Sequence, residues 1–269
     1  MGYFTVEVKP TILASHQAGN SSVYADGDVL FDWTSFQMPK GAAKLIGATC
    51  VFRGKNGGPQ TASDVDFFFA KTIDGVAPPT IGLSNGTAAC GPAVSNHIVG
   101  MARLDDGGSW GENEFDRFSI AQSGGSSEPS IPTEVVIQGE PDSGDNVGYD
   151  TVYLGAITGT ALDFGTTVLA RGGEADGVTV VETDKGTNDD PDAEMIFAPG
   201  DVLHSATDDV LGTVASIGSF IAYDDTDGTT QEATGKQVIT FTAVTPDVIA
   251  DNEEIFNINP IRIILSFEK

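Results

Sequence analysis

The stretch "IRIILSFEK", residues 261–269, decides the fold class of this chain, because apolar and other side chains alternate along it. The odd-numbered positions hold Ile261, Ile263, Leu265 and Phe267, and the even-numbered positions hold Arg262, Ile264, Ser266 and Glu268. Successive side chains of a β-strand point to opposite faces, so a period of two predicts a strand with one buried face.

Similar segments recur along the chain. "SDVDFFFAKT" places Val65, Phe67 and Phe69 opposite Asp64, Asp66 and Phe68. Further strand candidates are "YFTVEV", "DVLFDWTSF", "KLIGATCVFRG", "HIVGMARL", "EVVIQG", "DTVYLGAIT", "GVTVVET", "LGTVASIGSFIAY" and "QVITFTAV". Turns rich in Gly, Asn, Asp and Pro separate them, and no window has a helical apolar stripe. We therefore expect an all-β fold: an antiparallel, jelly-roll-like β-sandwich with a large loop-rich β insertion.

The composition describes a strongly acidic chain of 269 residues, with 39 acidic and 13 basic residues and a net charge of -26. Such a charge repels nucleic-acid backbones and anionic membrane surfaces, so neither is an expected partner. The N-terminal segment lacks the pattern of a secretion signal, and no apolar run is long enough to span a bilayer. The cysteines, Cys50 and Cys90, are expected to be two separate buried thiols rather than a disulfide or a metal site.

The loop composition shifts once. From about residue 103 to 194 the chain is rich in Gly, Ser, Asp and Glu, while strand segments persist between the loops. This pattern predicts a sandwich body formed by residues 1–95 together with 195–269, and an inserted acidic β subdomain at 96–194.

One tetrapeptide occurs twice: "GDVL" stands at residues 27–30 and again at 200–203. Beyond these four residues the flanking sequences do not agree, which disfavours an internal duplication. A Gly-Asp turn that leads into a Val-Leu strand start is common in β proteins. The two copies are therefore expected to begin different strands of one sandwich.

Several segments carry a resemblance to a known family. "YADGDVLFDWTSFQMPKGAAKLIGATCVFRG" and "DVDFFFAKTIDGVAPP" resemble the first half of small virion structural proteins of marine, cyanophage-like tailed bacteriophages, many of which are thought to decorate the capsid. "GDVLHSATDDVLGTVASI" and the terminal "IRIILSFEK" resemble later strands of the same family. Residues 96–194 depart from the family pattern.

The resemblance implies a non-enzymatic protein made in the host cytoplasm and bound to the outer capsid surface of the virion. It further implies the major capsid protein as a partner and a homotrimer as the assembled form. An outward position agrees with a charge that packaged DNA would repel.

No residue pattern names a catalytic chemistry. His16, His97 and His204 each stand alone, without a metal-ligand spacing, a nucleophile elbow or a phosphate-binding glycine loop nearby. Acidic pairs are so numerous that they do not single out a glycosidase site. We therefore expect no catalytic residues, no enzyme activity and no bound cofactor.

Two segments contain candidate binding residues. Trp110 and Phe115 in "GGSWGENEFDRF" would form a surface-binding patch, although such aromatic residues more often anchor a loop to its own domain. The ligands expected for calcium are Asp224, Asp225 and Asp227, in a loop that lacks the other positions of an EF-hand. Solvated acidic turns are the favoured interpretation of these carboxylates, and a structural calcium ion is the alternative.

Three functions remain open from the sequence. The leading one is a protein that cements or decorates a phage capsid. The second is a tail, collar or fibre protein that binds a host surface glycan through the inserted region and Trp110. The third is a carbohydrate-active enzyme on a β scaffold.

Overall fold

The computed structural model describes residues 2–17, 23–56, 64–104, 112–114, 118–122, 135–140, 149–173, 175, 177–185, 192–219 and 235–269. Its strands are β1 (Tyr3–Val8), β2 (Val29–Pro39), β3 (Ala43–Arg53), β4 (Val65–Ala70), β5 (Ile98–Leu104), β6 (Glu112–Glu114), β7 (Phe118–Gln122), β8 (Val135–Ile137), β9 (Tyr149–Thr158), β10 (Val168–Leu169), β11 (Val180–Lys185), β12 (Val202–Ser205), β13 (Val210–Ile217), β14 (Gly235–Phe241), β15 (Glu254–Asn257) and β16 (Ile261–Glu268). The helices within these residues are single turns: η1 (Ala14–His16), α1 (Pro92–Ser95) and α2 (Ala193–Ile196).

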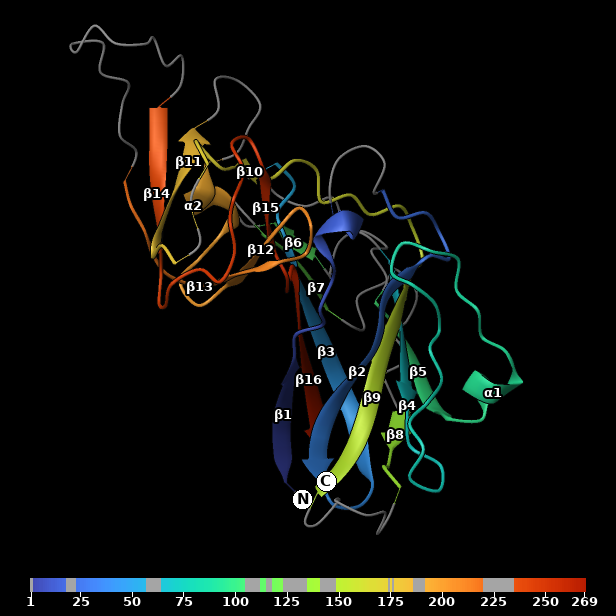
Figure 1. The fold of residues 1–269 in the computed structure, drawn as a ribbon. Helices are drawn as coiled ribbons and strands as arrows, with labels where there is room; N and C mark the ends of the chain where they lie inside the picture. The colour runs from blue at the N-terminus through green and yellow to red at the C-terminus, as the bar shows by residue number, and fades with distance from the viewer. Residues whose placement is uncertain are drawn as a thin grey trace, which may run out of the picture.

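Two sheets form an antiparallel sandwich, which confirms the predicted fold class (Figure 1). The first sheet has the order β1-β16-β3-β7-β6, with β8 also paired to β3, and the second has the order β2-β9-β4-β5. The first and last described residues lie side by side, because the Gly2 N–H donates to the Lys269 carbonyl and the Lys269 N–H donates to the Gly2 carbonyl. The last strand, β16, lies between β1 and β3 in the first sheet.

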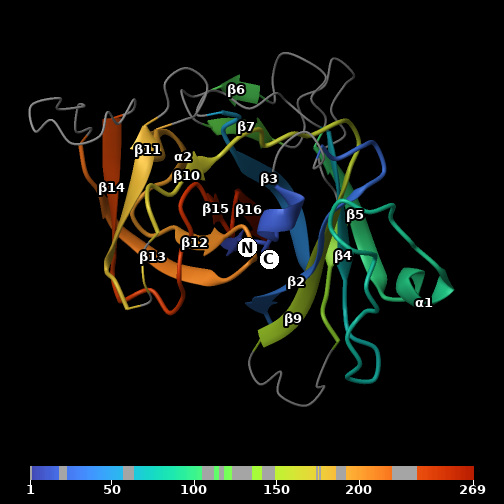
Figure 2. The ribbon, with the colours of Figure 1, turned by 45° about the horizontal axis from the view of Figure 1, so that its top comes forward.

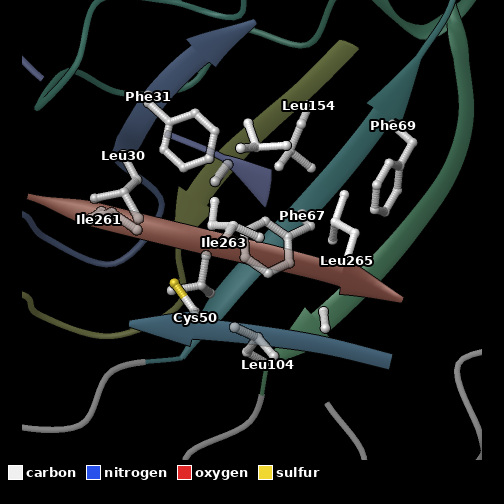
Figure 3. Packing of buried hydrophobic residues seen from close by; sticks show 14 of the residues in the cluster. Leu30, Phe31, Cys50, Phe67, Phe69, Leu104, Leu154, Ile261, Ile263 and Leu265 are labelled. Carbon is white, nitrogen blue, oxygen red and sulfur yellow. The ribbon is translucent and has the colours of Figure 1, made fainter. Parts of the chain in front are cut away.

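The core of the sandwich follows the alternation seen in the sequence. Ile261, Ile263, Leu265 and Phe267 are fully buried, as are Val65, Phe67 and Phe69. Figure 3 shows side chains from β16 and β3 meeting side chains from β2, β4 and β9 between the two sheets. Each fully buried side chain of this size contributes roughly 1.5–3 kcal/mol, so this shared interior holds the two sheets together.

A second β body, which we call the curled lobe, is formed by the described residues between 167 and 257. Its sheet has the order β10-β15-β12-β13-β14-β11. The sheet curls until its edge strands meet at the bridge between Ala170 and Thr183. Inside lies a separate hydrophobic cluster that contains Leu203, Ile239 and Ile255. Figure 2 shows this lobe beside the sandwich.

The two cores do not follow the predicted domain boundaries. β5, β8 and β9 fall within residues 96–194, yet they contribute to the sandwich core. β12 to β15 fall within residues 195–257, yet they form the curled lobe. The insertion between β9 and β16 is thus the curled lobe, not residues 96–194. The shift in composition marks where polar loops lie along the chain. Which hydrophobic core a strand joins depends instead on its pairing with strands far away in the sequence.

The two copies of GDVL begin strands of different bodies, β2 in the sandwich and β12 in the curled lobe. Locally they are the same turn: Gly27 has φ 85° and Gly200 has φ 96°. In each copy the aspartate N–H donates to the carbonyl of the alanine three residues earlier, at 3.1 Å for both Asp28 and Asp201. Each aspartate carboxylate accepts that alanine's N–H in return, at 2.7 Å and 2.9 Å. The expectation of a Gly-Asp turn leading into a strand is confirmed; that of a single sandwich is wrong.

The segment before β2 joins the two bodies. The Ile12 N–H donates to the Ile258 carbonyl at 2.9 Å, and the Ala14 N–H donates to the Asp208 carboxylate at 2.5 Å. The Gln17 side-chain amide donates to the Asn257 carbonyl at 2.8 Å. The N-terminal segment therefore hydrogen-bonds to the curled lobe at Asp208 and Asn257 and to the segment that follows it at Ile258.

Candidate interaction face

One outer face of the sandwich is covered by the connection between β4 and β5, residues 71–97, which we call the strap. The Trp33 indole N–H donates to the Pro79 carbonyl of the strap at 2.7 Å. The absence of a side chain at Gly155 on β9 lets Trp33 and Ile81 pack closely over that strand. A Cβ added at Gly155 would lie 3.0 Å from side-chain atoms of both residues. Ile81 and Val94 of the strap are buried. This face is therefore already occupied by the chain itself.

The opposite outer face is not crossed by any element among the residues that the structure describes. We call it the open face: the outward side chains of β1, β16, β3 and β8. Its lower row can be followed through the strand register, in which Tyr3 pairs with Glu268, Glu268 with Lys44, and Lys44 with Val136. Directly paired residues of antiparallel strands point to the same side of the sheet. Four strands thus share this side of the sheet. Figure 1 shows the chain termini at this end of the sandwich.

Large apolar side chains stand exposed on the open face. The exposed fraction is 68% for Tyr3, 60% for Val136 and 43% for Ile46. Ile46 is the extra residue of a β-bulge, since Ser266 pairs with Gly47 and Phe267 pairs with Leu45. The positions between these residues carry small hydroxyl side chains: Thr5, Ser266 and Thr49. Exposed apolar side chains bordered by polar residues are a feature of interaction sites.

Basic residues border this face. Lys9 and Arg262 lie at the end nearer the curled lobe, and Lys44 lies at the other end; we call these three residues the basic rim. The acidic residues that share the face are Glu268 and Glu7, and Glu7 pairs with Arg262 at 2.8 Å and with Lys9 at 3.6 Å. In the described part of the sandwich, the open face therefore has more cations than anions.

The curled lobe carries most of the acidic excess. Residues 167–257 contain 19 of the 39 acidic residues but only 3 of the 13 basic ones. Two of those three cations form ion pairs within the lobe: Lys236 with Glu182, and Arg171 with Asp184 at 3.9 Å. The rest of the chain contains 20 acidic and 10 basic residues, so both parts are net negative and the acidic excess is larger in the curled lobe.

The residues predicted as sites are not brought together by the structure. Trp110, Phe115, Asp224, Asp225 and Asp227 all lie outside the described residues, so their roles stay predictions. Within the described ranges, no group of three or more potential ligands could hold a metal ion.

The three histidines occupy separate elements. The His97 ring Nδ1 lies 2.8 Å from the Lys71 carbonyl and helps to close the strap. His204 on β12 is buried, and its ring nitrogens have no hydrogen-bond partner in the described part of the chain. His16 ends the short helix η1. None of them faces a nucleophile in an interaction that the structure shows.

The two cysteines are free, as predicted. Cys50 lies in the sandwich core, where burial raises the pKa of its thiol. Cys90 is exposed on the strap, which corrects the expectation that both thiols are buried. The apolar run around Cys50 predicted its burial, whereas Cys90 precedes a Gly-Pro pair in a covering loop.

Sequence reasoning did not find the open face. The alternation in "YFTVEV" predicted that β1 has one outward side, but its neighbours on that side depend on which strands pair with it. β16 and β8 are distant from β1 in sequence, and no local signal encodes their register.

No protein-family model, no curated protein and no solved structure matches this chain. None of the helices in the described ranges is long and apolar enough to cross a membrane.

Proposed function

We propose that this chain is a non-enzymatic virion structural protein that decorates or cements the outside of a phage capsid. The observation that carries the proposal is the uneven distribution of charge: an open sheet face with a basic rim on one body, and a concentration of acidic residues on the other. A protein held on a shell needs one surface for the shell and one for solvent. The open face suits the first role and the acidic lobe suits the second.

The rigidity of the scaffold supports the same proposal. Antiparallel sheets with fully buried side chains present a fixed surface, so little conformational entropy is lost when that surface binds. The proposed partner is the major capsid protein, and the proposed assembly is a homotrimer, because symmetric copies multiply the area buried against a shell.

Enzymatic function is not the proposal that the described residues favour. Catalysis requires a nucleophile or general base held near an orienting group. The interactions of the histidines described above are with backbone groups or are absent. The glycan-binding alternative has its candidate residues, Trp110 and Phe115, outside the described chain, so no structural observation favours it.

Co-sedimentation tests the proposal. The purified full chain is mixed with expanded heads that lack it, from the phage that encodes it, and the bound fraction is measured against protein concentration. We expect saturable binding at a fixed ratio of this chain to the shell protein. An absence of binding to heads, combined with binding to tails or host cells, would reject the decoration role.

A further inference from the structure

We propose that the open face is the shell-docking surface and that its partner is a protein surface bordered by carboxylates. This inference rests on the proposed function and specifies its contact. The occupant is thus the shell protein, recognised by charge complementarity to Lys44, Arg262 and the rest of the basic rim.

The charge distribution argues for a carboxylate-bordered partner. With a net charge of -26, most of this molecule repels acidic proteins. β16 has 8 residues, which at about 3.3 Å per residue makes the open face about 26 Å long. The Debye length at physiological salt is only about 8 Å. Repulsion from the curled lobe is therefore screened at the far end of the face, while contacts at Lys44 remain effective.

The geometry of the face supports a sheet-like contact. The apolar residues Tyr3, Ile46 and Val136 stand exposed on a surface four strands wide. At about 4.8 Å between strands, this surface measures at most about 19 Å across, or roughly 500 Å² in plane. A specific interface of standard size buries about 800 Å² per partner. One copy alone would therefore bind weakly, and an array of copies on a repeating shell would bind firmly through multivalency.

A second copy of this chain fits the face less well. A two-fold contact between two open faces would place one basic rim against the other. Both ends of the face carry cations, Lys9 and Arg262 at one end and Lys44 at the other, so reversing the direction of the partner does not relieve the repulsion. Charge complementarity thus favours a different protein as the occupant.

A pair of charge reversals tests the inference. Lys44→Glu with Arg262→Glu changes the rim, while Lys71→Glu with Arg103→Glu makes the same change of charge away from it. Arg103 is a fair match for Arg262, since both are about half exposed and both pair with an acidic residue. We expect the first variant to bind heads at least tenfold more weakly than the wild type at 0.15 M salt, and the control to bind normally. The difference should shrink at 1 M salt, where the Debye length is about 3 Å.

The outcomes separate the inference from the proposed function. If the wild type does not bind heads, the proposed function is rejected, and so is the shell protein as the partner of the open face. If the wild type binds and both variants bind equally well, only the docking face is wrong. Equal circular-dichroism spectra and unfolding midpoints of the two variants exclude misfolding as the cause of weaker binding.

Carbodiimide cross-linking identifies the occupant directly, because it joins a lysine amine to a carboxylate in contact. We expect Lys44 and Lys9 to be joined to aspartates or glutamates of the shell protein. Cross-links from these lysines to carboxylates of another copy of this chain, on heads as well as in solution, would overturn the proposal in favour of self-association.

Discussion

Gly27 and Gly200 form the same Gly-Asp turn at the start of strands in two different sheets. Both adopt the positive φ that L-residues avoid, and nothing lies within 4 Å of a Cβ added at either position. The Gly27 N–H donates to the Thr158 carbonyl, and the Gly200 N–H donates to the Val214 carbonyl, each at 2.8 Å. Glycine is therefore required by backbone conformation alone, not by space.

Gly27→Ala and Gly200→Ala should each destabilise the protein by about 1 kcal/mol, because alanine is strained at positive φ. Gly47→Ala is the matched control, since its added Cβ is equally unobstructed and its φ is not positive. Urea unfolding of the three variants measures the effect. A loss at Gly47 equal to that at Gly27 would show that the turn conformation is not the cause.

At the scale of elements, the strap covers one face of the sandwich and is fastened at its start by Glu140. The Glu140 carboxylate accepts hydrogen bonds from the Thr72 hydroxyl and the Asp74 N–H at 2.6 Å, and from the Gly75 N–H at 2.9 Å. These bonds, that of Thr72 foremost, lower the pKa of Glu140. A single carboxylate after β8 thus holds the first turn of the strap.

The fastening should depend on pH. Because the folded-state pKa of Glu140 is depressed, its contribution is complete above the ordinary glutamate value of 4.5 and is lost as the pH falls through the lower folded value. We expect faster hydrogen exchange at the Asp74 and Gly75 amides in Glu140→Gln at neutral pH than in the wild type.

Glu194→Gln in the curled lobe is the control for this experiment and should leave exchange in the strap unchanged. If Glu140→Gln also leaves both amides equally protected, the carboxylate does not hold the turn.

At the scale of the whole molecule, Arg53 lies where the chain leaves the sandwich and where it returns. The Arg53 backbone N–H donates to the Pro260 carbonyl at 2.7 Å, and its side-chain Nη2 donates to the Phe164 carbonyl at 2.8 Å. The guanidinium lies 5.4 Å from the centre of the Phe164 ring. Burial lowers its pKa to about 10, against the opposing effect of Asp163. This one residue contacts both segments that connect the sandwich to the curled lobe.

Arg53→Met should destabilise the protein by about 2 kcal/mol, because it leaves the buried Phe164 carbonyl without its donor. The thioether fills much of the same volume, so the effect is not that of a cavity. Lys55→Met, which removes the more exposed 2.6 Å pair with Asp163, should cost less than about 1 kcal/mol.

Guanidinium unfolding monitored for both variants checks this prediction. Increased proteolysis near residues 165–167 in Arg53→Met would show that the connection has loosened. A stability equal to the wild type would mean that the buried cation contributes nothing to joining the two bodies.

The sequence by itself determined the fold class, since alternation in segments such as 261–269 follows from the geometry of a strand and needs no partner. The same local chemistry determined the Gly-Asp turns and the burial of Cys50. Only the tertiary structure decided that β5, β8 and β9 join the sandwich while residues 167–257 form a separate lobe. It alone placed Tyr3, Lys44 and Val136 in one row of the open face. The physical reason is that strand register is fixed by contacts between residues far apart in the chain, whereas periodicity and composition are local.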